Sequence, residues 1–171
     1  MSNDQKKVMA GMIAAVAFSA SFFVIAFRMT EIDLPVPNGS DISWRLEYAL
    51  KCEIFPALCL LAGVGRIANR RFFMPAAIGG AVVPALEIDE RYLQNTLEQL
   101  VLAFAAHLAL AVTLPGSSLR AIALLAALFV IGRATFWLGY HHSGPARAFG
   151  FATTFYPTVG AYAYVIWRLV W

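Results

Sequence analysis

Residues 8–27 read VMAGMIAAVAFSASFFVIAF, a run of twenty residues without a charge. A helix needs roughly 20 apolar residues to cross a hydrocarbon core of about 30 Å, so this run has the length of one membrane span. Lys6 and Lys7 precede the run, as basic residues do in a secretory signal peptide. The run is longer than a signal core, and its small-residue cleavage pattern is poor. We therefore interpret it as a retained transmembrane helix.

Four further apolar runs follow in the 171-residue chain, at about residues 48–64, 97–114, 121–140 and 149–170. Because lipid offers no hydrogen-bond partners, each run is expected to form a helix. The composition agrees, because 13% of the residues are charged, against about 25% in a soluble domain. The sequence predicts an all-α integral membrane bundle of five helices, forming a single membrane domain over residues 1–171.

The charge pattern also excludes several classes of function. The net charge is +3, and no basic run is interleaved with aromatic residues, so nucleic acid is not an expected partner. His141 and His142 are adjacent and lack a third ligand, so no metal site is predicted. The chain has no glycine-rich phosphate loop, no catalytic triad and no HExxH motif.

Basic residues near the ends of the runs set the expected orientation. With the N-terminus in the cytoplasm, seven of them fall inside and four outside, as the positive-inside rule requires. The seven are Lys6, Lys7, Arg66, Arg70, Arg71, Arg91 and Arg147, and the four are Arg28, Arg45, Arg120 and Arg168. We expect an integral protein of the inner (cytoplasmic) membrane with its N-terminus in the cytoplasm.

The linkers differ in kind. Residues 72–86 are apolar, but two prolines and the pair Gly79 and Gly80 disfavour a long helix, so this segment is expected either to lie in the inner membrane interface or to fold over another group. Residues 115–118 (PGSS) are expected to form a tight turn in which a serine caps the next helix. Four glycines are expected to permit close helix packing, namely Gly11, Gly63, Gly65 and Gly160.

Arg91, Asn95 and Glu98 form a polar stripe at the predicted cytoplasmic start of the third helix. At about 100° per residue, Asn95 and Glu98 lie within roughly 40° of Arg91. The stripe is either a pocket for a charged small molecule or an interfacial helix start. In the second case Glu98 suits the helix dipole and Arg91 extends to the head groups. Ionisable groups at membrane depth are costly, and Glu98 lies about two turns into the helix, which favours the pocket.

A second polar set lies at the cytoplasmic end of the fourth helix. Arg133, Trp137 and Tyr140 share one face, and Arg147 follows seven residues after Tyr140, at the start of the fifth helix. An aromatic belt with basic anchors explains the last three, but Arg133 lies deeper. Both sets are expected on the same side of the membrane, where together they could bind a small anionic or zwitterionic ligand.

These residues carry a family resemblance. The spacing Arg91-x-x-x-Asn95-x-x-Glu98 resembles a signature of the MAPEG family, the membrane-associated proteins in eicosanoid and glutathione metabolism. The segment 132–140 is similar to the Arg-x-x-Tyr-x-x-Gly-Tyr segment of that family, with phenylalanine in place of the first tyrosine, and Arg147 follows at the matching distance. The resemblance covers residues 46–171 as a four-helix unit and leaves residues 8–27 as an extra N-terminal transmembrane helix.

The resemblance implies a homotrimer with glutathione bound between neighbouring subunits near the cytosolic side. Glutathione would be the co-substrate of a transferase, and its thiolate would attack a lipophilic small-molecule substrate that arrives from the membrane lipid. Hydroperoxide reduction would be a further activity. The implied glutathione-binding residues are Arg91, Asn95 and Glu98 of one subunit and Arg133 of the adjacent subunit, which would also supply Tyr140 and Arg147. Tyr140 and Arg147 would be catalytic, with Arg147 stabilising the thiolate. One of Arg66, Arg70 and Arg71 is also implied at the site, and the resemblance does not select among them.

Two alternatives stay open. One is an isomerase or another glutathione-using enzyme on the same scaffold. The other is a non-catalytic membrane protein that binds lipid or an assembly partner in the same pocket. The extra helix at residues 8–27 is apolar on nearly every face, so it is expected to pack outside the four-helix unit. Its deletion is then expected to spare glutathione binding.

Overall fold

The computed structural model describes residues 1–29 and 41–171, and every regular element in these ranges is helical. The long helices are α1 (Asn3–Met29), α2 (Ile42–Phe72), α4 (Glu87–Thr113), α5 (Arg120–His142) and α6 (Arg147–Val170). The short elements are α3 (Pro75–Ile78), η1 (Pro84–Leu86), η2 (Gly116–Ser118) and η3 (Gly144–Ala146). The predicted all-α bundle is confirmed, and each apolar run lies within one long helix to within a residue.

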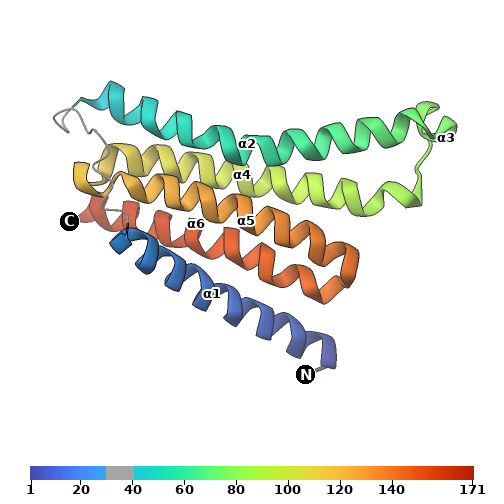
Figure 1. Ribbon diagram of the computed structural model, residues 1–171, viewed down its shortest axis with the longest axis horizontal. Coiled ribbons are helices and arrows are strands. Elements are labelled where there is room, and N and C mark those ends of the chain that lie inside the picture. The colour runs from blue at the N-terminus through green and yellow to red at the C-terminus, as the bar shows by residue number, and fades with distance from the viewer. Residues whose placement is uncertain (30–40) are drawn as a thin grey trace.

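The five long helices lie side by side and alternate in direction (Figure 1). One end of the bundle holds the first residues of α1, α4 and α6 and the last residues of α2 and α5. We call it the Arg147 end. The opposite end holds the first residue of α5 and is called the Arg120 end. Residues far apart in the sequence therefore meet at each end.

Four of these helices, α1, α2, α4 and α5, are long and apolar enough to cross a membrane. The chain is therefore an integral membrane protein. Helix α6 has 24 residues, or about 36 Å of length, but threonines, tyrosines and Pro157 make it less apolar. Its three threonines face the bundle, since Thr153, Thr154 and Thr158 are buried.

Helix α1 packs on the outside of the other four long helices, against α6 and α5 (Figure 1). In α1 only Ala15 and Ser19 are buried, and the remaining side chains are exposed or partly exposed. Gly11 allows the close approach to α6, because a Cβ there would lie 3.2 Å from the backbone nitrogen of Phe149. The predicted peripheral position of this helix is therefore observed.

Helices α5 and α6 approach each other through glycines. A Cβ on Gly150 would lie 2.1 Å from the backbone nitrogen of Phe136, and a Cβ on Gly132 would lie 2.5 Å from Cγ2 of Thr154. A Cβ on Gly139 would lie 2.7 Å from the backbone where α6 begins. The two backbones are therefore close along much of the hairpin, and this contact fixes α6 against α5.

Two local expectations are wrong. Gly65 and Gly160 have no atom within 4 Å of an added Cβ, so neither mediates close packing within the described chain. The N-cap of α5 is Leu119 rather than a serine, and it makes no side-chain cap hydrogen bond. The reason is that η2 continues directly into α5, so the Ile122 N–H donates to the carbonyl of Leu119.

Arg45, counted above among the outer basic residues, is buried in the first turns of α2. Its Nε donates to the carbonyl oxygen of Ala111 at 2.6 Å, and its Nη2 donates to that of Leu114. The last carbonyls of a helix lack partners and carry the negative end of the helix dipole. Arg45 therefore ties the start of α2 to the end of α4.

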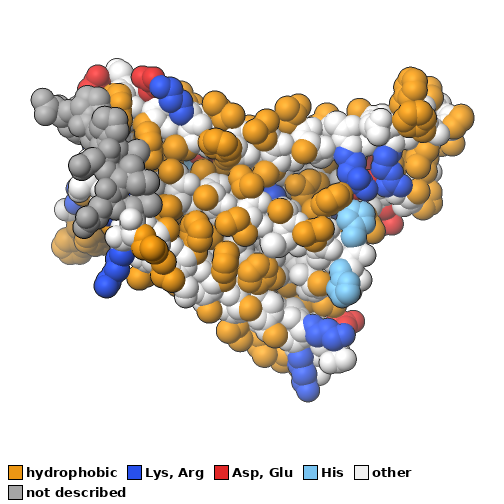
Figure 2. Space-filling model, viewed as in Figure 1, with side chains coloured by type: hydrophobic (Ala, Val, Ile, Leu, Met, Phe, Trp, Pro, Cys, Tyr) orange, Lys and Arg blue, Asp and Glu red, His pale blue; other side chains and the backbone are white. Residues whose placement is uncertain are grey.

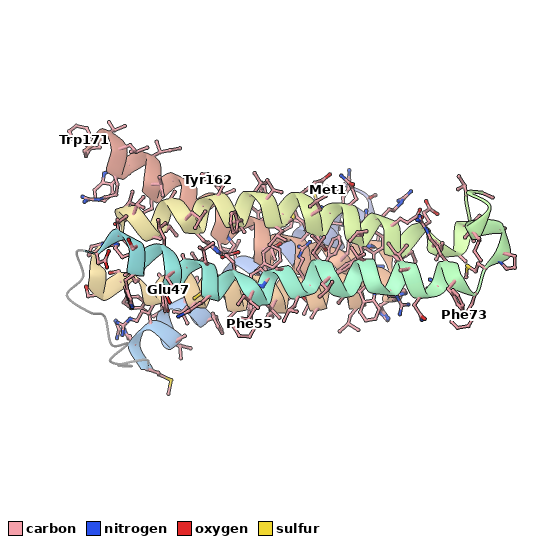
Figure 3. The ribbon with its side chains drawn as sticks, turned by 90° about the horizontal axis from the view of Figure 1, so that it is seen from above. Met1, Glu47, Phe55, Phe73, Tyr162 and Trp171 are labelled. Atoms are coloured by element: carbon pink, nitrogen blue, oxygen red, sulfur yellow. The ribbon has the colours of Figure 1, made fainter. Side chains whose placement is uncertain are left out.

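The surface is mostly apolar between the two ends. Figure 2 shows hydrophobic side chains over the middle of the molecule and the charged and histidine side chains gathered near its ends. Phe55, in the middle of α2, is 61% exposed and points away from the bundle (Figure 3). The segment after α2 exposes Phe73 and Val82 and turns at Gly80, where φ is +82°. As predicted, it forms no long helix.

Candidate functional site

The polar residues predicted for the site come from three helices that meet at the Arg147 end. Asn95 lies two turns into α4, and Arg133 and Tyr140 lie in the second half of α5. Arg147 is the first residue of α6, directly after the short turn η3. The close passage of Gly139 against Ala146 keeps that turn tight. It thereby fixes Arg147 next to the end of α5.

Arg133 is fully buried, with 0% of its surface exposed. Its Nη1 donates to Oδ1 of Asn95 at 2.8 Å, and its Nη2 donates to Oγ1 of Thr154 at 2.5 Å and to the carbonyl oxygen of Gly150 at 3.4 Å. The guanidinium also lies 4.7 Å from the centre of the Phe136 ring, a cation–π distance. Asn95 and Arg133 of one chain therefore already contact each other, so Arg133 links α4, α5 and α6.

A cavity of about 640 Å³ opens beside this contact. Its polar lining comes from Asn95, Tyr140 and Arg147, and the guanidinium of Arg147 lies 4.4 Å from the centre of the Tyr140 ring. Val8 and Met12 of α1 form part of its wall. The volume lies within the range of about 300–1,000 Å³ typical of small-molecule sites. The extra helix is thus part of this cavity.

The other two members of the predicted stripe lie outside the cavity lining. Arg91 is exposed and its Nη2 bonds Oε1 of Glu87 at 2.5 Å, one turn earlier on α4. Glu98 is exposed and accepts a hydrogen bond of 2.9 Å from Gln94. Asn95 is half-buried, whereas Arg91 and Glu98 lie on the surface of the bundle. Within one chain, only Asn95 of the three lines the cavity.

The three arginines at the end of α2 have partners on α4. Asp89 is 2% exposed and accepts from Nε of Arg66 at 2.8 Å and from Nη1 of Arg70 at 2.6 Å. Arg71 pairs with Glu90 on the surface at 2.8 Å. None of the three lines the cavity. The sequence analysis missed Asp89, because an acidic residue in the first turn of a helix ordinarily serves the helix dipole.

The Asp89 cluster is expected to stabilise the Arg147 end. Asp89→Asn keeps the shape of the side chain but removes the charge that two guanidinium groups bind. Hydrogen bonds to charged groups contribute about 1.5–3 kcal/mol each, so we expect a loss of roughly 2 kcal/mol or more in denaturation from mixed micelles. Glu90→Gln is the matched control, because its pair with Arg71 is exposed and such pairs contribute about 0–1 kcal/mol. Equal stabilities of the two variants would contradict the cluster's role.

A second ionisable pair lies deeper in the bundle. His107 of α4 is 2% exposed and its Nδ1 contacts Oε1 of Glu53 on α2. The second carboxyl oxygen of Glu53 has no hydrogen-bond partner among the described residues. His107 is therefore a helix-contact histidine, and its partner is the carboxyl group of Glu53. Ionisable groups at such depth are usually paired or functional.

The chain is similar to known proteins over the helices that form this site. The model of the MAPEG family matches residues 48–167. The chain is 26% identical to mouse transmembrane protein 79 over 165 residues, covering 95% of this chain and 41% of the mouse protein. It is 28% identical to bovine transmembrane protein 79 over 123 residues, covering 71% of this chain and 31% of the bovine protein.

The chain thus spans less than half the length of these two relatives. No solved structure matches it. The family match begins within α2 and ends within α6, so it includes every polar residue of the cavity lining and leaves α1 outside. A match over this much of the chain shows that the protein belongs to the MAPEG family.

Proposed function

We propose that this protein is a membrane-embedded glutathione transferase whose site is the cavity at the Arg147 end. The supporting observation is that Arg147 and Tyr140 line one cavity, with the guanidinium of Arg147 4.4 Å from the Tyr140 ring. Asn95 lines the same cavity and is held by the buried Arg133. This arrangement offers a fixed cation, a phenol and an amide to a peptide ligand.

The chemistry follows from the thiol. An ordinary cysteine thiol has a pKa of about 8.5, and the thiolate is the nucleophile. A guanidinium within reach favours the charged form and so lowers the thiol pKa. In the proposed reaction the thiol proton leaves to solvent through the cavity mouth. The sulfur electron pair then forms a bond to an electrophilic carbon, which releases a leaving group or takes up a proton at the neighbouring atom.

The wider assembly is part of the same proposal. The excess of basic residues at the Arg147 end favours the cytoplasmic side for that end, which is also where α1 begins. The family membership favours a homotrimer, in which the exposed Arg91 and Glu98 would be available to a ligand shared with a neighbouring subunit. Because Val8 and Met12 line the cavity, we now expect deletion of α1 to weaken glutathione binding rather than to spare it.

A second candidate is a non-catalytic protein that holds a lipid in this cavity. The cavity lining favours lipid binding, because much of the wall is apolar. The apolar residues are Val8, Met12, Phe136 and Phe151. A lipid would bind without thiolate formation. Binding of glutathione to the detergent-purified protein therefore separates the two candidates.

The decisive test concerns Arg147. Arg147→Ala should abolish the ultraviolet absorbance of the thiolate when glutathione binds, because the stabilising cation is lost. Arg147→Lys should restore it partly, since lysine keeps the charge but not the planar fork of donors. Arg168→Ala, at the opposite end of α6, is the matched control and should behave as the wild type. Full thiolate formation in Arg147→Ala would refute the proposed role.

A further inference from the structure

The cavity at the Arg147 end changes from polar to apolar with depth. Its outer part holds Tyr140, near the end of α5, and Arg147, at the start of α6. Phe136 and Phe151 also line the cavity. Each lies four residues further from the Arg147 end on the same helix, which is about 6 Å deeper. On α5 and α6 the lining beyond the cation and the phenol is therefore apolar.

Helix α1 lines the same cavity. Val8 and Met12 are partly buried and four residues apart, so they lie on one face of α1, and both are part of the lining. Gly11 holds this part of α1 against the start of α6, because a Cβ there would lie 3.4 Å from Cβ of Ala148. Met9, by contrast, is 48% exposed and does not line the cavity. Met12 is therefore the innermost residue of the cavity on α1.

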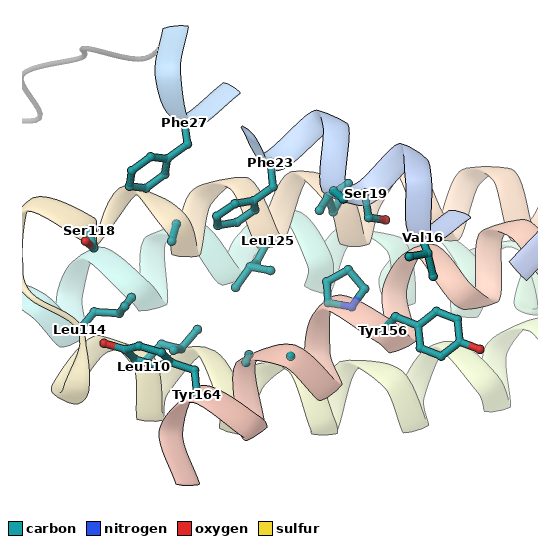
Figure 4. A pocket seen from close by; sticks show the side chains of 16 residues that line it. Val16, Ser19, Phe23, Phe27, Leu110, Leu114, Ser118, Leu125, Tyr156 and Tyr164 are labelled. Carbon is teal, nitrogen blue, oxygen red and sulfur yellow. The ribbon is translucent and has the colours of Figure 1, made fainter. Parts of the chain in front are cut away.

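Met12 also marks the boundary with a second, separate cavity. Figure 4 shows Val16, four residues further along the same face of α1, lining this cavity of about 500 Å³ toward the Arg120 end. On α6 the second cavity begins at Tyr156, five residues after Phe151. The two cavities share no lining residue. Met12 therefore lies between two apolar spaces.

The three inner side chains differ in how firmly they are held. The ring of Phe136 lies 4.7 Å from the buried guanidinium of Arg133, and Phe151 stacks on Phe155 with ring centres 5.3 Å apart. Neither ring can turn aside without losing such a contact. Methionine, in contrast, is unbranched and flexible, and Met12 is only partly buried. Met12 is therefore the side chain that a ligand at this depth would meet and displace.

We propose that the cavity at the Arg147 end takes an electrophile with a straight hydrocarbon chain, and that Met12 sets the longest chain it accepts. This inference rests on the proposed function, to which it adds the substrate class. The reacting carbon meets the sulfur beside Arg147, and the hydrocarbon chain extends inward past the two phenylalanine rings to Met12. Because α1 lies outside the residues matched by the family model, the limit comes from a helix that the matched unit lacks.

S-Alkylglutathiones test this limit directly, since each carries the hydrocarbon chain on the sulfur and binds without turnover. S-methyl-, S-hexyl- and S-decylglutathione are titrated into the full chain in detergent, and calorimetry measures their affinities. Each methylene group that enters an apolar site strengthens binding by up to about fourfold. In the wild type the affinity should rise from methyl to hexyl and level off before decyl, because the chain then meets Met12.

Two substitutions move the limit in opposite directions. Met12→Ala joins the site to the second cavity, so the decyl compound should gain about tenfold in affinity relative to the hexyl compound, the effect of about two buried methylene groups. Met12→Trp shortens the site, so the hexyl compound should lose about tenfold relative to the methyl compound. Met9→Trp is the matched control and should keep the wild-type ratios. All proteins are measured at one detergent concentration, so partition of the probes into micelles cancels.

The outcomes separate this inference from the proposed function. If none of the three compounds bound the wild type, the glutathione proposal would fail, and the inference with it. If they bound and Met12→Ala left the ratio of decyl to hexyl affinity unchanged, the glutathione site would stand and the role of Met12 would be refuted. Met12→Ala only removes atoms from the cavity wall, so it decides the question even where Met12→Trp does not insert.

Discussion

Gly150→Ala is expected to destabilise the bundle more than an alanine at any other glycine in the described helices. The added Cβ would lie 2.1 Å from the backbone nitrogen of Phe136, 2.5 Å from its Cα and 2.6 Å from the carbonyl oxygen of Gly132. All three are backbone atoms, so no side-chain rotation can relieve the overlap and α6 must move away from α5. Overpacking ordinarily costs about 1–3 kcal/mol, and we expect a loss of about 3 kcal/mol or more here.

Denaturation in mixed micelles, followed by circular dichroism, measures this loss. Gly160→Ala is the matched control in the same helix, because nothing lies within 4 Å of its added Cβ. It should be neutral or more stable by about 0.5–1 kcal/mol, since alanine is the better helix former. The hairpin packing would be refuted if the two alanine variants unfolded at the same denaturant concentration.

His107→Leu is expected to have the second large effect. The change removes the partner of Glu53, whose second carboxyl oxygen already has no hydrogen bond among the described residues. Removing one member of a buried pair costs about 3–5 kcal/mol, whereas replacing both members by apolar groups is often neutral or stabilising. The double variant Glu53→Leu with His107→Leu should therefore recover most of the stability that the single change loses.

A double-mutant cycle measured by the same denaturation gives the coupling energy of the pair. Lys51→Met is the control on α2, because the pair of Lys51 with Glu47 is exposed and should contribute at most about 1 kcal/mol. If the double variant were as unstable as the sum of the single variants, the Glu53–His107 contact would not be what links α2 to α4 at this depth.

The helices could be predicted from the sequence because each apolar run is a local signal of the right length. The starts of α2 and α4 could not, since their amphipathic ends extend beyond the apolar part, whereas α5 and α6 begin and end within two residues of the apolar runs. This mattered for Glu53. An apolar run starting at residue 48 places Glu53 near a helix end, whereas α2 starts at Ile42 and places it deep in the bundle. The depth of an ionisable group thus depends on a boundary that hydropathy locates poorly.

Only part of the candidate site could be predicted, because sequence spacing shows which residues share a helix face but not which neighbour that face meets. Spacing along one helix indicated Asn95, and the short turn after α5 indicated that Tyr140 and Arg147 lie together. Spacing cannot show how a helix is rotated against its neighbours. That rotation places Asn95 against Arg133 but leaves Glu98 on the surface. It also decides that Arg66 and Arg70 meet Asp89, a contact between residues 19 and 23 positions apart.

The burial of Arg133 has a consequence for how the chain enters the membrane. Among the described residues, the hydrogen-bond acceptors of its guanidinium lie on α4 and α6, and none lies on its own helix. Until α6 has entered the membrane, Asn95 is the one acceptor of this set that Arg133 can reach. An arginine at the centre of a lone helix costs about 2.5–3.5 kcal/mol to insert. Helix α5 should therefore stay beside the translocon until α6 emerges, and the two should partition into lipid as one hairpin.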